Sequence, residues 1–249
     1  MSESASIHSF STLKRAPAYQ AVSDKIRGAI LSGELQEGDL LPTETELAEQ
    51  FGVTRSTVRE AIRLLEQGGL LGRADRKRLA VRLPSVEMAS RSVNAAMRMH
   101  RVTFKDLWEI SMGLEPLAAR LACAAATEHD KQLIAMNLER TREVIAENEA
   151  LLMVEIEFHA LVARASHNHA LLLAREPLNE LFFPAYRPVI ERLKPGKRIL
   201  QSHQNIFNAI VANDPDTAAE WAEKHMLDFR RGIEMADLDL NSPLEPVTE

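Results

Sequence analysis

The stretch from 43 to 62, Thr-Glu-Thr-Glu-Leu-Ala-Glu-Gln-Phe-Gly-Val-Thr-Arg-Ser-Thr-Val-Arg-Glu-Ala-Ile, decides the fold of the first third of the chain. Thr43 and Glu46 stand three residues apart directly after a proline, a spacing typical of the capping box that begins a helix. Ala48 supplies the small residue that two crossing helices need, and Gly52 supplies a turn residue that tolerates a positive φ angle. A second helix follows the glycine, so the stretch predicts a helix-turn-helix.

The exposed residues at the start of this second helix are suited to DNA. Apolar residues that pack it onto the first helix are Leu47, Val53, Val58, Ala61, Ile62 and Leu65. With these directed inward, Arg55, Thr57 and Arg59 lie at the N-terminal end, which enters the major groove in this motif. Arginine makes bidentate contacts to guanine, and threonine contacts phosphates or thymine methyl groups. The alternative, a helical hairpin with a solvated charged face, is disfavoured by the joint occurrence of all these elements.

Segments on both sides complete a small domain. Apolar spacing predicts a helix over residues 19–31. Residues 70–82 alternate in polarity around the charged turn 75–78, which indicates a two-stranded hairpin. We therefore predict a winged helix-turn-helix over residues 18–83, preceded by a flexible lead at residues 1–17.

The same stretch, extended from Leu40 to Glu66 and followed by Gly69-Leu70, resembles the DNA-binding signature of the GntR family of bacterial regulators almost residue by residue. The resemblance covers residues 18–82 and implies that Arg55 and Arg59, with Thr57, contact the operator. The residues expected to contact DNA are Thr43, Arg55, Ser56, Thr57, Arg59, Arg63, Arg76, Lys77 and Arg78.

Two departures from the family pattern concern auxiliary DNA contacts. Thr45 stands where the family usually has an arginine that adds a contact. The wing, Gly72-Arg-Ala-Asp-Arg-Lys-Arg-Leu-Ala-Val81, lacks the usual Gly-x-Gly run whose tip enters the minor groove. We expect the basic residues 76–78 to replace that contact at phosphates or in the minor groove, the alternative being a solvated turn.

Composition and charge agree with a helical DNA-binding protein. The 249 residues are 45% apolar and only 5% aromatic, which favours helices over sheets. The net charge of −6 is unevenly distributed, because residues 51–82 hold eight basic and three acidic residues. Residues 86–249 hold 18 basic and 25 acidic residues, so DNA contact is expected from the first domain alone. Without an export signal, a long apolar span or a second cysteine beside Cys123, the chain is expected to be soluble and cytoplasmic, without a disulfide or a membrane partner.

The remainder of the chain predicts an all-helical domain over residues 86–236 and a flexible tail at residues 237–249. We expect a bundle of six to seven helices, with the fifth interrupted near its prolines, at residues 86–100, 104–126, 130–148, 150–166, 169–193, 197–212 and 215–236. The fold class is therefore mainly α, with a small β-hairpin in the winged helix-turn-helix.

Four residues of this second domain are candidate metal ligands. Glu155 and His159 stand four residues apart on one expected helix, so both face the same side. His203 and His225 fall on two later helices. Three imidazoles and a carboxylate suit Zn²⁺, Ni²⁺ or Mn²⁺. On spacing alone, ordinary core or surface histidines remain the alternative.

Short motifs in the second domain resemble the FCD effector domain of the FadR branch of the family. They lie at residues 114–122, 155–159, 165–168, 203–210 and at His225. In metal-binding members an aspartate and three histidines hold an ion that helps to bind a carboxylate effector. The resemblance thus implies Glu155, His159, His203 and His225 as ligands, with Glu155 where aspartate is usual. The arginine that commonly pairs with the effector is absent from residues 110–115.

These observations predict a ligand-responsive transcriptional regulator, a repressor, that binds a palindromic operator as a homodimer. Its effector is expected to be a small organic acid, bound with help from a divalent metal. One alternative is a metal-dependent enzyme that uses the Glu/His cluster with Glu157 or a bound water as base, although no nucleophile motif is present and we do not expect catalysis. A non-specific architectural DNA-binding protein is the other alternative, and the acidic second domain argues against it.

Overall fold

A computed structural model describes residues 17–75 and 78–243. The chain divides into two compact units, Met1–Ser85 and Val86–Glu249. Each unit has its own apolar core, so each is described by itself.

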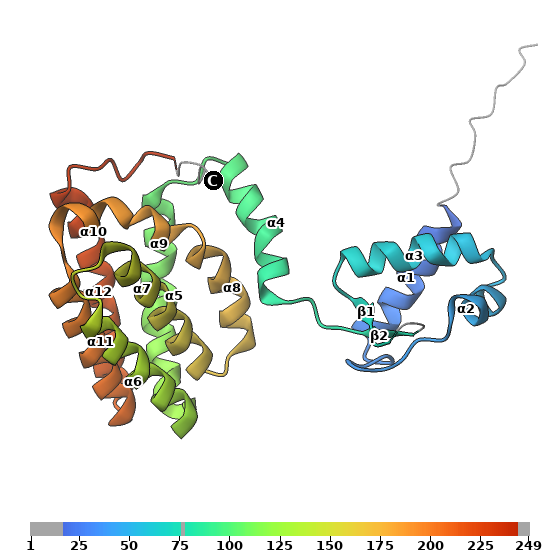
Figure 1. Cartoon of the computed structure of the whole chain (residues 1–249), viewed down its shortest axis with the longest axis horizontal. Coiled ribbons are helices and arrows are strands. Elements are labelled where there is room, and N and C mark those ends of the chain that lie inside the picture. The colour runs from blue at the N-terminus through green and yellow to red at the C-terminus, as the bar shows by residue number, and fades with distance from the viewer. Residues whose placement is uncertain (1–16, 76–77, 244–249) are drawn as a thin grey trace, which may run out of the picture. The chain divides into compact units, whose positions relative to one another are not determined.

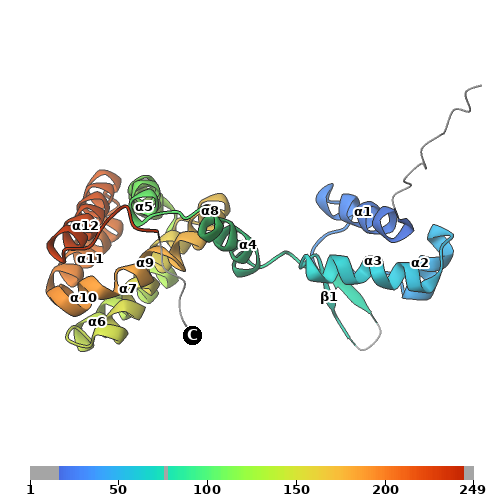
Figure 2. The same ribbon diagram turned by 90° about the horizontal axis from the view of Figure 1, so that it is seen from above.

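The first unit consists of three helices and a hairpin (Figure 1). They are α1 (Ala18–Leu31), α2 (Glu44–Phe51), α3 (Arg55–Gln67), β1 (Leu71–Arg73) and β2 (Leu79–Val81). Helix α3 packs against both α1 and α2, as Figure 2 shows. Its buried residues Val58, Ala61, Ile62 and Leu65 are the centre of the core.

The turn between α2 and α3 forms for the local reasons that the sequence suggests. The Thr43 hydroxyl accepts from the Glu46 amide while the Glu46 carboxylate accepts from the Thr43 amide, which completes a capping box. Gly52 ends α2 with a φ of 64°, in the left-handed region that glycine adopts readily. Thr54 then caps α3 by accepting from the Thr57 amide.

The hairpin pairs β1 and β2 antiparallel, with Leu71 opposite Val81. A third segment extends it, because Leu40 bridges Ala80 and the Leu41 amide donates to the Leu79 carbonyl at 2.8 Å. This pairing ties the segment before α2 to the wing.

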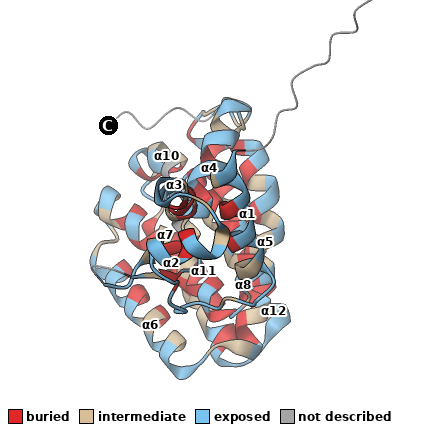
Figure 3. Cartoon of the chain, turned by 90° about the vertical axis from the view of Figure 1, so that its right-hand side faces the viewer, coloured by how far each residue is buried: buried red, intermediate tan, exposed pale blue. Residues whose placement is uncertain are grey.

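The second unit is all helical and is built around a bundle in which α5, α7, α11 and α12 run side by side (Figures 1 and 2). Its helices are α4 (Val86–Met99), α5 (Phe104–Ala125), α6 (Glu128–Glu143), α7 (Asn148–Ala165), α8 (His169–Asn179), α9 (Phe182–Ala185), α10 (Arg187–Leu193), α11 (Gly196–Val211) and α12 (Pro215–Met235). Buried residues follow the inward side of these helices, coloured red in Figure 3, and exposed residues cover the outward side. The mainly helical class with one small hairpin is therefore confirmed.

Three details of the second unit differ from the sequence-based expectation. The stretch 169–193, expected as one helix interrupted near its prolines, forms three separate helices, with Pro177 in the last turn of α8 and Pro188 as the second residue of α10. Helix α6 begins at Glu128 rather than 130 and ends at Glu143, since Thr127 is its N-cap.

The tail is the third difference. Residues 237–243 were expected to be flexible, but Leu238 and Leu240 pack against the apolar core, and the Lys105 amide donates to the Leu240 carbonyl at 2.9 Å. These apolar and backbone contacts hold the segment on the bundle. Within the described residues, no helix is both long and apolar enough to cross a membrane.

Candidate functional site

A hollow of about 490 Å³ on the first unit is lined by several of the residues expected to contact DNA. It lies between the start of α2, the exposed side of α3 and the hairpin. Its lining includes Thr43, Arg55, Arg59, Arg63 and Arg73. Residues from three segments therefore form one basic concave surface, which we call the reading surface.

Hydroxyl groups gather at the N-terminus of α3. The Thr54 hydroxyl lies 2.8 Å from that of Ser56 and 2.9 Å from that of Thr57. The free backbone amides and the dipole of a helix N-terminus favour an anion, and hydroxyl donors add to that preference. Thr54 was not among the residues expected to contact DNA, although a threonine directly before a helix is the signal for a cap.

The arginines of the reading surface are exposed, and Arg59 and Arg63 lie beside carboxylates. Arg59 donates to Glu44 on α2 through Nε at 3.3 Å and Nη2 at 3.1 Å. Arg63 lies 3.8 Å from Glu60, one turn earlier on α3. Both pairs are exposed, so DNA phosphates or bases can compete with the carboxylates.

The remaining expected contacts are placed as follows. Arg78 closes the wing turn by donating its amide to Asp75 at 2.8 Å, and its side chain lies on the surface near Thr43. Arg76 and Lys77 lie outside the described residues. Thr45, which replaces the usual arginine, lines the same hollow.

The four expected metal ligands meet in the buried centre of the second unit. Glu155 and His159 come from α7, His203 from α11 and His225 from α12, and all four are at least 97% buried. One ligand atom from each residue lies within 4.8 Å of all the others. We call these four residues the Glu/His cluster.

Several distances within the cluster are those of neighbouring ligands in a coordination shell. The Glu155 carboxylate lies 3.4 Å from Nε2 of His159, 3.3 Å from Nε2 of His203 and 3.0 Å from Nε2 of His225. The Nε2 atoms of His203 and His225 lie 3.1 Å apart. A metal with bonds of about 2.1 Å holds neighbouring ligand atoms roughly 3.0–3.4 Å apart. The extra methylene of glutamate, compared with aspartate, therefore leaves the carboxylate within reach of the histidines.

Two further buried residues support the cluster. Nδ1 of His159 lies 2.8 Å from the Glu115 carboxylate, whose other oxygen accepts from Nε of Arg175 at 2.7 Å. A carboxylate on the far nitrogen of a histidine fixes the ring and the tautomer that a metal requires. Glu115 lies within the motif at residues 114–122 but was not predicted as part of the site, and neither was Arg175.

Charges within the cluster favour a cation. Burial raises the pKa of Glu155, but the His203 and His225 imidazoles and hydrogen bonds from the histidines lower it well below its usual range. Burial lowers the pKa of His203 to about 4 against the opposing effect of Glu155, so this imidazole is neutral at pH 7. Arg175 and His159 outweigh burial and hold the pKa of Glu115 at about 2. Burial lowers the pKa of His159, but Glu115 and Glu155 outweigh burial and raise it above its usual value, so a bound metal ion would take the place of the His159 proton beside Glu155.

Glu157, considered above as a base, does not join the cluster. Its carboxylate accepts from Asn137 at 2.9 Å and from Arg140 at 2.6 Å. These partners hold it on the α6 side of α7. The geometry thus offers no base at that position.

Family models match both units of the chain. Residues 18–81 match the bacterial regulatory proteins of the gntR family, and residues 106–228 match the FCD domain. The chain belongs to the GntR family of bacterial regulatory proteins. It is a DNA-binding transcriptional regulator with an effector domain, and the resemblance stated from the sequence is confirmed.

Relatives support this assignment along most of the chain. The Glc operon transcriptional activator of Escherichia coli (strain K12) is 27% identical over 236 residues, which cover 91% of this chain and 92% of the activator. The repressor NanR of Cronobacter sakazakii is 26% identical and covers 86% of this chain and 84% of NanR. The solved structure of a Streptococcus agalactiae GntR protein aligns with a TM-score of 0.63 and 25% identity, over 86% of this chain and 99% of that one.

Proposed function

We propose that this regulator reads its operator with Arg55, Thr57 and Arg59, and that its helical domain holds a divalent metal that helps to bind a small carboxylate effector. The observation that carries the proposal is the buried convergence of three imidazoles and one carboxylate in a domain of effector-binding type. Repression is the expected mode, although the relatives include a protein named as an activator and one named as a repressor.

The chemistry of the Glu/His cluster fits a metal. Oε2 of Glu155 is buried and has no hydrogen-bond partner among the described residues. A Zn²⁺, Ni²⁺ or Mn²⁺ ion would supply the missing partner. The bound ion would act as a Lewis acid toward an anionic ligand, while His159, fixed by Glu115, would hold its position.

DNA reading is proposed for a homodimer on a two-fold symmetric site. The reading surface of one chain presents a single α3, which spans one half-site. Two-fold related chains would therefore protect two half-sites roughly one helical turn apart, about 10 base pairs. DNase footprinting on the DNA upstream of the regulator's own gene tests this, and protection of one half-site alone contradicts it.

The metal proposal is tested by elemental analysis of full-length protein purified without chelator. We expect about one divalent ion per chain in the wild type and in His129→Ala, an exposed histidine used as control. We expect little metal in His203→Ala and in Glu155→Gln, which keeps the side-chain shape. Added Zn²⁺ should raise the melting temperature of metal-stripped wild type and control only. A metal-free wild type that Zn²⁺ does not stabilise contradicts the proposal.

A further inference from the structure

Arg175 is an unusual residue for the interior of the helical unit. It lies on α8, is only 1% exposed, and stands about one turn from the buried apolar residues Leu171 and Leu178. A buried ion pair is often no more stabilising than well-packed apolar residues of similar volume. Stability alone therefore does not account for an arginine at this position, and the reason for it lies in its polar contacts.

The polar contact of Arg175 is with Glu115 on α5, a carboxylate that is held from two sides. Its Oε1 accepts from Nε of Arg175 at 2.7 Å, and its Oε2 lies 2.8 Å from Nδ1 of His159 on α7. All three residues are at least 97% buried, so water does not compete for these contacts. Arg175 thus fixes the place of a carboxylate that in turn fixes the direction of an imidazole.

The direction of the His159 ring is the one that metal binding requires. With Nδ1 turned to Glu115, Nε2 lies 3.4 Å from the Glu155 carboxylate, and the ring is within 9° of parallel to that of His225. Half a turn of the ring would put carbon atoms in the places of both nitrogens. The contact with Glu115 opposes that turn and so keeps Nε2 available as a ligand atom.

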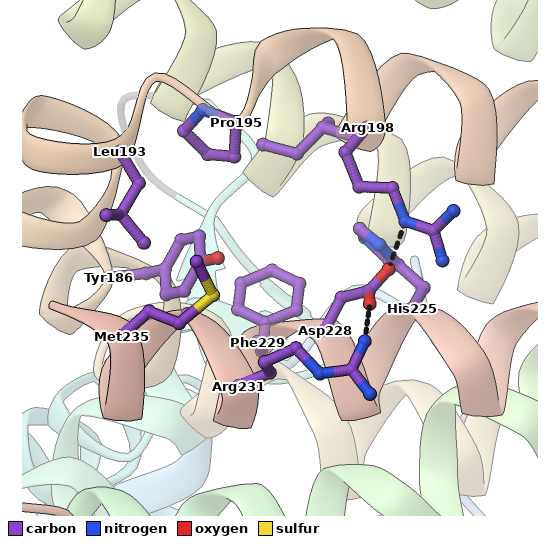
Figure 4. A pocket seen from close by; sticks show the side chains of 11 residues that line it. Tyr186, Leu193, Pro195, Arg198, His225, Asp228, Phe229, Arg231 and Met235 are labelled. Carbon is purple, nitrogen blue, oxygen red and sulfur yellow. Dashed lines mark hydrogen bonds and ion pairs between the residues drawn. The ribbon is translucent and has the colours of Figure 1, made fainter.

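The other two histidines of the cluster have no carboxylate at Nδ1 among the described residues. Nδ1 of His203 is buried and has no hydrogen-bond partner there. His225 borders a cavity of about 320 Å³ formed by α10, α11 and α12 (Figure 4). His159 is therefore the ligand whose direction is set most firmly by other protein groups.

The carboxylate on the cavity side of the cluster is already engaged. Asp228 lines the same cavity as His225, but it accepts from Nε of Arg198 at 2.6 Å and lies 3.7 Å from Nη1 of Arg231. Dashed lines in Figure 4 mark both contacts. Support for a metal ligand from outside the cluster thus comes from the Glu115 side.

Arg175 also keeps Glu115 from becoming a ligand itself. Carboxylates bind Zn²⁺, Ni²⁺ and Mn²⁺, and the Glu115 carboxylate lies directly against a residue of the cluster. Because Arg175 engages Oε1, Glu115 is held behind His159 rather than within the cluster. The cluster then keeps one carboxylate and three imidazoles.

The contact between Arg175 and Glu115 connects α8 to the cluster. Helix α8 supplies none of the four ligands, yet Arg175 joins it to α5 and, through Glu115, to His159. An ion that fixes His159 therefore restrains α8 as well.

We propose that Arg175 is a positioning residue of the metal site: it holds Glu115, which directs Nε2 of His159 to the ion, and it passes the restraint of a bound ion to α8. This inference rests on the metal binding proposed above. It assigns part of the metal affinity to a residue outside the cluster, and loss of such a residue typically weakens metal binding roughly 10–100-fold.

Titration of chelator-stripped, full-length protein with Co²⁺ tests the inference, because the visible absorption of Co²⁺ reports both its affinity and the arrangement of its ligands. Arg175→Met, which keeps an unbranched side chain without the charge, should bind Co²⁺ at least about 10-fold more weakly and with a changed spectrum. Arg175→Lys, which retains the charge and a donor, should recover most of the affinity. Wild-type affinity and spectrum in Arg175→Met would overturn the inference.

A matched control separates positioning from packing. Leu178→Ala truncates a buried side chain one turn later on α8 and should lower the melting temperature. It should leave the affinity for Co²⁺ and the spectrum as in the wild type, because Glu115 keeps its partner. An equal loss of affinity in Leu178→Ala and Arg175→Met would mean that Arg175 acts only through packing, which overturns the inference.

Hydrogen exchange tests the connection to α8 and needs no folded variant for its main result. Saturating Zn²⁺ should slow exchange of the amides of residues 169–179 in the wild type. In Arg175→Met, saturating Zn²⁺ should still slow exchange in α11 and α12, which carry ligands, but no longer in α8. Unchanged exchange in α8 of the wild type on Zn²⁺ binding overturns the inference.

The outcomes also separate this inference from the metal proposal. If the wild type binds Co²⁺ and Arg175→Met binds it equally well, the metal site stands and the role of Arg175 is overturned. If the wild type binds neither Co²⁺ nor Zn²⁺, both are overturned.

Discussion

Arg59 is held by Glu44 in the free protein, at 3.1 Å from Nη2 to Oε2. In the reading surface this carboxylate both orients the guanidinium and repels phosphates. The Glu44 carboxylate therefore weakens contacts of Arg59 with DNA of any sequence. A guanine, which offers two acceptors, can replace the carboxylate. Glu44 is thus expected to contribute to sequence discrimination rather than to affinity.

Replacing Glu44 tests this role. Glu44→Gln should increase affinity for random DNA and lower the ratio of specific to random binding about 10-fold, because Arg59 loses the partner that restrains it. Glu49→Gln removes the same charge from the exposed end of α2 and should leave the ratio unchanged. Fluorescence anisotropy with operator and scrambled duplexes measures both, and equal ratios for the two variants would contradict the role.

The buried Glu115–Arg175 pair is the residue-scale feature with the largest expected effect on stability. Glu115→Gln leaves the arginine charge buried and should cost about 3 kcal/mol of unfolding free energy. Asp216→Asn, which breaks the exposed pair with Arg120, should cost less than about 1 kcal/mol. Urea denaturation at pH 7 measures both, and similar losses would contradict the structural importance of the buried pair.

The same pair predicts a pH dependence. The pKa of folded Glu115 is about 2, below its ordinary 4.5, so the unfolded chain binds the proton more readily. Its stabilisation is complete above pH 4.5 and is lost as the pH falls toward 2. The difference in unfolding free energy between wild type and Glu115→Gln should therefore shrink across that window. A constant difference would show that Glu115 is not the titrating group.

At the scale of elements, the start of α11 depends on a glycine. A Cβ on Gly196 would collide with the Ile145 carbonyl and side chain and approach Leu151, all of which belong to neighbouring packed segments. Gly196→Ala should therefore cost about 1–3 kcal/mol. Gly113→Ala, within α5 and with no atom near the new methyl group, should stabilise by about 0.5–1 kcal/mol. Thermal unfolding of both variants tests this, and stabilisation by Gly196→Ala would refute the packing.

Local chemistry explains which elements the sequence predicted. Thr43 and Gly52 act through residues three or four positions away, so their roles as cap and turn were readable. The position of Leu238 and Leu240 on the bundle depends on long-range packing, and a short acidic segment gave no periodic signal for it.

The candidate site likewise contains residues that the sequence predicted and residues whose roles depend on long-range packing. The i, i+4 spacing placed Glu155 and His159 on one side of a helix, and the family resemblance supported His203 and His225, which the sequence alone left as candidates. Arg175 lies 60 residues from Glu115 in sequence, in an apolar stretch where it resembled an ordinary exposed arginine. The sharing of Asp228 by Arg198 and Arg231 depends on how α11 meets α12, which no short motif encodes.

At the scale of the whole molecule, the distribution of charge indicates that the first unit contacts DNA and the second does not. Residues 51–82 carry eight basic and three acidic residues, whereas residues 86–249 carry 18 and 25. Arg63→Ala should reduce the slope of log affinity against log salt concentration by about 1, because one phosphate contact is lost. Arg140→Ala, in the acidic unit, should leave the slope unchanged. Equal slopes for Arg63→Ala and the wild type would remove Arg63 from the contact set.

Sequence-specific reading by Arg55 and Arg59 is the central claim, and its most direct test is an anisotropy titration with the DNA upstream of the regulator's own gene and with a scrambled duplex. We expect the wild type to prefer the upstream DNA by about 10³-fold or more. Arg55→Ala and Arg59→Ala should each reduce that preference at least about 10-fold, whereas Arg27→Ala on α1 should preserve it. An unchanged preference in Arg55→Ala and Arg59→Ala would contradict the claim.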